Sequence, residues 1–138
     1  DVDLGVTGLQ NVLTDWHTQN LDERGRPQLI RPKLLIVYPS DLFTARELLQ
    51  SEFKPGTANN EVNAIREEGL SFMVSHYLTD TDAWFLLGDQ HDINFVWDVR
   101  PRGGMEEDFD TETIKRKVVE GFFVSHGEWR GVWGSSGG

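Results

Sequence analysis

The chain lacks cysteine altogether and has no long apolar run. Without cysteine, its 138 residues can form no disulfide, thiolate nucleophile or cysteine-ligated zinc site. No stretch approaches the ~18 consecutive apolar residues that a membrane helix requires, and the start DVDLGVTGLQ lacks the basic and apolar regions of a signal peptide. We therefore expect a soluble protein, made in the cytoplasm, with no membrane partner.

Basic residues are the second deficit. There are 13 Lys and Arg against 23 Asp and Glu, a formal net charge of -10, and a surface of that sign repels phosphate backbones. We expect no sequence-specific nucleic-acid partner. The densest basic stretch favours a solvated turn or a protein contact over a phosphate site; it holds Arg24, Arg26, Arg31 and Lys33. The acidic run 106–112 lacks the glycine and alternating ligands of a calcium loop.

Motifs that carry chemistry are also missing. The sequence has no HExxH, GxSxG, GxxxxGK[ST] or GxGxxG motif, so nothing supports a zinc protease, a serine hydrolase or a nucleotide cradle. We predict no catalytic, metal-binding or cofactor-binding residue and no cofactor. One alternative stays open, a small metal-assisted hydrolase that uses Asp80, Asp82 and His91. The TDTD segment is more typical of a turn, in which Thr and Asp side chains bond their own backbone.

Apolar residues are present in regular patterns. Leu9, Val12, Leu13 and Trp16 recur at helical spacing and predict a helix over 8–18, with Thr7 and Gln10 at capping-box spacing before it. The run 34–38 predicts a buried strand. A second helix follows, capped by Ser40 or Asp41, and its apolar positions share one face: Leu42, Ala45, Leu48 and Leu49.

Alternation with a period of two predicts strands in the second half of the chain. These are 70–75, then 83–88 and 93–99 as a hairpin, and a long strand over 114–126 with a bulge at Gly121. Segment 100–108 reads as a loop. Trp129 and Trp133 need something to pack against. The expected fold is α+β, a mixed sheet with two main helices and about five strands.

Two loops are candidates for contacts between subunits, because their polar composition makes them costly to bury. In the turn 20–27 the candidates are Arg24 and Arg26. The loop 54–63 contributes Asn59 and Asn60. We expect the arginines of one copy to face Glu67 and Glu68 of the next. A monomeric protein-interaction module remains the alternative in which these loops serve another partner.

Several segments together resemble the major capsid proteins of tailed bacteriophages, particularly the Mu-like major head subunit group. The matching stretches lie in order along nearly the whole chain: RPKLLIVYPSDLFTARELLQSE, PGTANNEVNAI, LSFMVSHYLTDTDAWFLL, and DFDTETIKRKV with WRGVWGS. Four segments in register make the likeness fairly specific. The chain has no counterpart of that family's amino-terminal arm, extended loop or spine helix, so it resembles the carboxy-terminal half.

The resemblance implies a structural role and the Hong Kong type capsid fold, with an axial and a peripheral domain. Residues 1–110 would form the axial-like domain, and 111–138 a long strand and tail that return toward the peripheral domain. The implied partners are copies of the chain in pentamers and hexamers, with scaffold or portal proteins in addition. The implied location is the capsid of the virion. Some members crosslink through a late asparagine, but no Asn follows Asn94 here.

Overall fold

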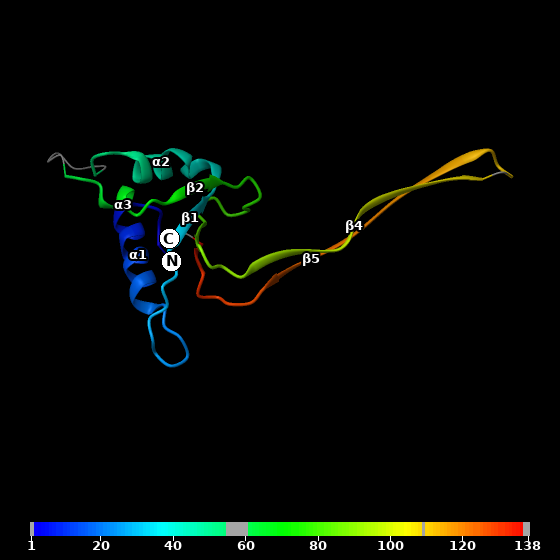
Figure 1. The fold of residues 1–138 in the computed structure, drawn as a ribbon. Coiled ribbons are helices and arrows are strands. Elements are labelled where there is room, and N and C mark those ends of the chain that lie inside the picture. The colour runs from blue at the N-terminus through cyan, green and yellow to red at the C-terminus, as the bar shows by residue number, and fades with distance from the viewer. Residues whose placement is uncertain (1, 55–60, 109, 137–138) are drawn as a thin grey trace. The chain divides into compact units, whose positions relative to one another are not determined.

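A computed structural model describes residues 2–54, 61–108 and 110–136. It divides into a compact unit, Asp1–His91 with Trp129–Gly138, and a hairpin unit, Asp92–Glu128. The compact unit holds four helical segments and four strands (Figure 1): α1 Val6–Gln19, β1 Pro32–Val37, η1 Pro39–Asp41, α2 Leu42–Gln50, α3 Ala64–Glu67, β2 Ser71–Val74, β3 Trp84–Gly88 and β6 Val132–Ser135. The hairpin unit consists of β4 Ile93–Asp108 and β5 Thr113–His126.

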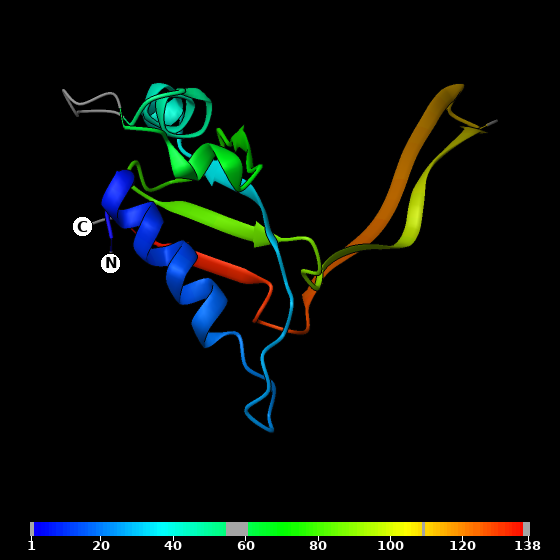
Figure 2. The ribbon, with the colours of Figure 1, turned by 60° about the vertical axis from the view of Figure 1, so that its left-hand side comes forward.

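The compact unit is built on a mixed sheet with strand order β2-β1-β3-β6. β1 runs parallel to β2 and antiparallel to β3, and the chain returns from the hairpin to add β6 antiparallel to β3. Figure 2 shows α1 running along one face of this sheet. The expected α+β class with a mixed sheet is confirmed.

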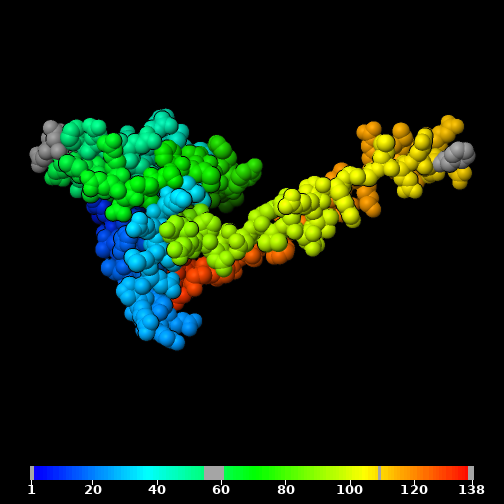
Figure 3. Space-filling view, viewed as in Figure 1, coloured from blue at the N-terminus to red at the C-terminus, as the bar shows by residue number. Residues whose placement is uncertain are grey.

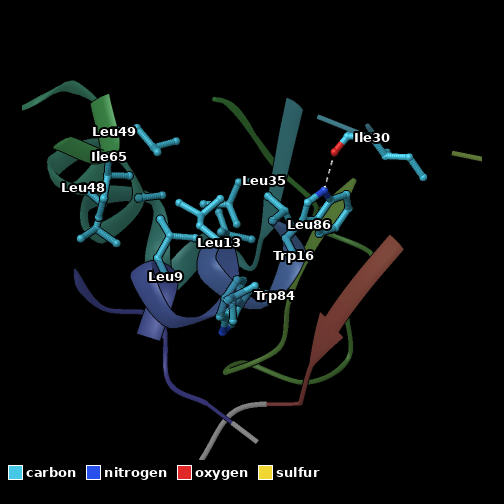
Figure 4. Packing of buried hydrophobic residues seen from close by; sticks show 13 residues of the cluster. Leu9, Leu13, Trp16, Ile30, Leu35, Leu48, Leu49, Ile65, Trp84 and Leu86 are labelled. Carbon is cyan, nitrogen blue, oxygen red and sulfur yellow. Dashed lines mark hydrogen bonds between the residues drawn. The ribbon is translucent and has the colours of Figure 1, made fainter. Parts of the chain in front are cut away.

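The core lies between that sheet face and the helices. The predicted stripe of α1 is confirmed, since all four of its residues are buried in one cluster with apolar residues of α2, α3 and the sheet (Figure 4). Leu35 and Leu86 in adjacent strands are fully buried. The indole Nε1 of Trp16 donates a hydrogen bond of 2.8 Å to the backbone carbonyl of Ile30. The polar edge of this large ring is thereby satisfied inside the core.

The ends of the helices differ from the expected caps. α1 begins at Val6 with Gly5 as its N-cap, so the predicted capping box at Thr7 is wrong: Thr7 already lies inside the helix. Asp41 precedes α2 but makes no side-chain cap bond. Asn63 caps α3 by accepting from the amide of Ile65, and its Nδ2 donates 2.7 Å to the carbonyl of Leu48. This buried side chain ties α3 to α2.

The hairpin unit is a two-stranded antiparallel ribbon. β4 and β5 pair from Ile93 with His126 out to Asp108 with Thr113. The register shifts on either side of Val99, which lies opposite Gly121. The irregularity therefore falls at the predicted glycine, and the extra residues belong to β4.

Two predictions about this part of the chain need correction. The segments 83–88 and 93–99 do not form a hairpin, because β3 pairs with β1 and β6 while β4 pairs with β5. Segment 100–108 is no loop but the distal half of β4, held by pairing to β5. The boundary expected at residue 110 stays a prediction; the strands before and after it, β4 and β5, pair with each other.

Candidate intersubunit surfaces

The hairpin carries a cluster of exposed aromatic rings near its base. Phe95 and Trp97 are two residues apart on β4 and point to the same side, and Trp97 lies opposite Phe122 of β5. The ring centroids are 5.1 Å apart for Phe95 and Trp97, 5.1 Å for Phe95 and Phe122, and 5.8 Å for Trp97 and Phe122. The side chains remain 54%, 40% and 54% exposed.

The segments around this cluster contain no charged residue. Residues 93–97 read INFVW and 122–126 read FFVSH; together we call them the aromatic base. The opposite side of the ribbon is also apolar there, since Val96 pairs with Phe123 and both are exposed. The rest of the hairpin, by contrast, carries many acidic and basic side chains, with an acidic block at 106–108 and a basic block at 115–117, as is typical of a solvated ribbon.

A ribbon of this kind is short of stabilising contacts. Every residue of β4 and β5 is exposed or at most half-buried. The two strands form a sheet of their own, which is drawn in yellow and orange in Figure 3. A two-stranded hairpin is marginally stable in water unless a third strand or a packed face supports it. Both sides and both edges of the aromatic base are therefore suited to contact with another surface.

An ion pair fastens the far end of the hairpin. Lys115 Nζ lies 2.8 Å from Asp108 Oδ2, and the amide of Asp110 donates to the other carboxylate oxygen at 3.3 Å. The hydrogen bond from Lys115, and then that from Asp110, lowers the pKa of Asp108 below its ordinary value. Within the acidic run 106–112, Asp108 is thus paired with a basic side chain of β5, that of Lys115.

The predicted interface residues of the first loop lie on a tight, self-contained turn. Asp22 Oδ1 accepts hydrogen bonds from the backbone amides of Arg24 and Arg26 at 2.8 and 2.7 Å, and Gly25 adopts φ +73. Both arginines are exposed, and their backbone is held without using their guanidinium groups. They are available to a neighbouring molecule, although their pairing with another copy stays a prediction.

The other predicted interface residues lie apart from this turn. Glu67 is the last residue of α3 and Glu68 is its C-cap, and both are exposed. Asn59 and Asn60 lie outside the described residues. Phe53 and Val62, which the structure describes on either side of that segment, form an isolated antiparallel β-bridge.

The structure keeps the residues of the alternative hydrolase apart. Asp82 precedes β3 and His91 follows it, so the five-residue strand separates them by roughly 16 Å at 3.3 Å per residue. Asp80 Oδ1 accepts from the amide of Asp82 at 3.2 Å, which is the turn geometry expected of this segment. Across the described ranges, no three His, Asp or Glu side chains gather as metal ligands.

Asp82 lies near a second carboxylate, that of Asp41. Burial, and secondarily the charge of Asp82, raises the pKa of Asp41 above its ordinary value. Ser40 donates to the carbonyl of Thr81 at 3.2 Å, which holds the two segments together. The hydrogen bond from Ser40 therefore joins the two segments at a place where two carboxylates repel each other.

The two late tryptophans have different environments. Trp133 of β6 packs on Trp84 with ring centroids 4.7 Å apart, as expected. Trp129 is 67% exposed, with the guanidinium of Arg130 4.9 Å from its ring centre. The prediction that both rings pack in the protein holds fully for Trp133 alone.

Comparison with known protein families gives a match over nearly the whole chain. A family model described as phage capsid protein covers residues 2–134. No curated protein and no solved structure matches the chain. Among the helices of the described residues, none is long and apolar enough to cross a membrane.

Proposed function

Because the chain belongs to the phage capsid protein family, we propose that it is a major head subunit whose copies assemble into an icosahedral shell around the DNA. Its role is then structural, and its place is the capsid of the virion after synthesis in the cytoplasm of the bacterial host. Copies of the chain are its main partners, in pentamers and hexamers. Scaffold and portal proteins are further partners.

The observation that carries this proposal is the hairpin with its uncharged aromatic base. A monomer gains little from displaying three clustered aromatic rings to water, since burying one such side chain is worth about 1.5–3 kcal/mol. A subunit of a shell gains that free energy when neighbours cover the ribbon. The family match and the exposed hairpin support the same role independently.

The division of the chain into two units suits the Hong Kong type fold. In this proposal the compact unit corresponds to the axial domain, and the hairpin of 92–128 is part of the peripheral domain. Subunits related by rotation make heterologous contacts, which close into rings when the rotation closes. The proposed boundaries thus lie at the two ends of the hairpin, because a boundary at residue 110 would separate its paired strands.

Two other functions make different predictions. A metal-assisted hydrolase would bind a divalent ion tightly, which titration calorimetry with Zn²⁺ and Mg²⁺ would detect. A monomeric interaction module would keep the mass of one chain at every protein concentration. The capsid subunit requires closed particles and gives no tight stoichiometric metal binding.

Assembly of the intact protein is the test. After expression in a bacterial host, light scattering should find a species far heavier than a hexamer, and electron microscopy should reveal closed particles of uniform diameter. If the protein stays monomeric at all concentrations, with and without a co-expressed scaffold, the proposed function is wrong.

A further inference from the structure

The sheet of the compact unit has a second apolar face, opposite the core. Its six side chains come from all four strands and lie next to one another in register: Leu34, Ile36, Met73, Phe85, Leu87 and Val132. We call this set the outer face. None of the six belongs to the buried core cluster, which takes alternate residues of the same strands.

The outer face is uncharged and partly open. Met73 is 48% exposed, and the other five are half-buried. The ring of Phe85 lies over Gly134, where an added Cβ would meet the ring at 2.7 Å. A hollow of about 470 Å³ opens beside this ring, and its wall also contains Leu78 and the carboxylate-bearing Asp80. The face therefore offers both a flat aliphatic area and a recess.

Electrostatics restricts which surfaces of two copies can meet. Each copy carries a formal charge of -10, so copies repel one another unless the contact is neutral or complementary. The outer face and the aromatic base are two strand surfaces without any Asp, Glu, Lys or Arg. One is mainly aliphatic and the other aromatic, so rings can fill the spaces between branched side chains.

We propose that the aromatic base of one copy docks on the outer face of a second copy. The proposal rests on the proposed function, since it names the contact by which capsid subunits associate. Phe95, Trp97 and Phe122 lie against the aliphatic side chains, and a ring enters the hollow beside Phe85. Each copy has both surfaces, so the contact is heterologous and continues from subunit to subunit.

The contact area is small, so the docking is effective only when many copies of the contact form in one particle. Four strands at 4.8 Å and five residues at 3.3 Å give a face of roughly 300 Å². Stable pairs bury about 800 Å² on each partner. One contact is thus too small to hold a dimer in dilute solution, and repetition around a closed particle makes it effective.

The absence of native cysteine permits a direct test by disulfide crosslinking. Leu87→Cys places a thiol at the centre of the outer face, and Val124→Cys places one beside the aromatic cluster without removing a ring. The two variants, one of them isotope-labelled, are mixed before assembly and oxidised. We expect a heterodimer of the two variants by mass spectrometry, in particles and in concentrated solution. Leu29→Cys, at an 89% exposed leucine, is the control and should give no heterodimer with Val124→Cys.

Other products would contradict the proposal. Leu87→Cys linked to itself would indicate face-to-face pairing, and an intrachain bond in the double variant at high dilution would place both surfaces within one molecule. Particles without any heterodimer would overturn the docking while leaving the capsid function intact. If the unmodified protein forms no particles, the proposed function fails, and the concentrated mixture still decides the docking.

A substitution series supplies a second readout. Leu87→Glu should reduce the yield of particles at least tenfold, because it places a carboxylate in an apolar contact. Leu29→Glu changes the net charge equally at an exposed site and should leave the yield within about twofold. Circular dichroism must find both variants folded. Normal particles from folded Leu87→Glu would refute the docking. If Leu87→Glu does not fold, the crosslinking of Leu87→Cys with Val124→Cys decides the question.

Discussion

Phe95 and Phe122 stack across the two strands of the hairpin, with ring centroids 5.1 Å apart and planes inclined by 25°. They are on different strands and in diagonal positions, so the contact joins β4 to β5 beyond the backbone ladder. Such aromatic pairs contribute about 0.5–1.5 kcal/mol beyond the burial of their area. In a ribbon without a core, that is a large share of the stability.

Replacing Phe122 with alanine should therefore loosen the hairpin and leave the compact unit intact. We expect the amide signals of 93–97 to move toward random-coil values in NMR spectra, with the thermal unfolding of the compact unit unchanged. Phe43→Ala, at a ring that is 68% exposed on α2, is the matched control. A cooperative loss of the compact unit in Phe122→Ala would show that the two units fold together.

Leu13 tests the core of the compact unit. Its side chain is buried in the cluster that joins α1 to the sheet, so Leu13→Ala should lower the free energy of unfolding by about 2–5 kcal/mol. Leu29→Ala removes the same atoms from an 89% exposed site and should cost under about 0.5 kcal/mol. Urea unfolding followed by tryptophan fluorescence measures both. Equal losses would mean that α1 does not pack as described.

Acid should weaken the far end of the hairpin. The pKa of Asp108 is lowered in the folded state, chiefly by Lys115, so its carboxylate stabilises the fold above the unfolded pKa. That stabilisation is lost as the pH falls through the lowered folded pKa. In Lys115→Met the pKa of Asp108 should rise toward 3.8, which an NMR titration of the carboxyl carbon would detect. An unchanged pKa would mean that the ion pair does not persist in solution.

Reversing Arg24 and Arg26 to Glu tests the predicted charge contact with Glu67 and Glu68 of a neighbour. Rim charges influence encounter and specificity more than stability. We expect fewer particles by electron microscopy and a nearly unchanged melting temperature, because Asp22 holds the turn through backbone amides. Normal shells from the double reversal would refute the pairing.

The local elements could be predicted where one face is buried by neighbours close in sequence. The stripe of α1, the run of β1 and the alternation of β2 each reflect contacts with a single layer, and their residues match the expected ones. The period of an element indicates which side is buried. It does not indicate the partner strand.

The prediction of which strands pair with each other was therefore wrong for β3 and β4. β3 has partners about 50 residues away on each side, in β1 and β6, and proximity in sequence wrongly favoured β4. Segment 100–108 resembled a loop because Pro101, Gly103 and Gly104 disfavour strands. Pro101 falls at the register shift, where the regular ladder is interrupted, and the glycines are held by Lys117 and Val118 across the ribbon.

The candidate surfaces were only partly visible in the sequence. The charged composition of the turn 20–27 predicts that Arg24 and Arg26 are exposed. The pattern of the aromatic base predicts strands but does not indicate that their aromatic side chains are exposed. The alternation of Phe95 and Trp97 indicates that both rings lie on one side of the strand. It indicates a contact surface only together with the structure, in which every residue of β4 and β5 is exposed or half-buried. Whether an apolar strand is exposed depends on which other elements pack against it, and the periodicity of its sequence carries no information about those elements.

Hydrogen–deuterium exchange of the intact protein, before and after assembly, tests the central claim most directly. Amides of β1 and β3 should exchange slowly in both states, because they lie inside the paired sheet. Amides of 93–97 and 122–126 should exchange rapidly in the free chain and become protected at least tenfold in closed particles. Equal exchange of the aromatic base in free and assembled protein would contradict the role of this hairpin in joining subunits.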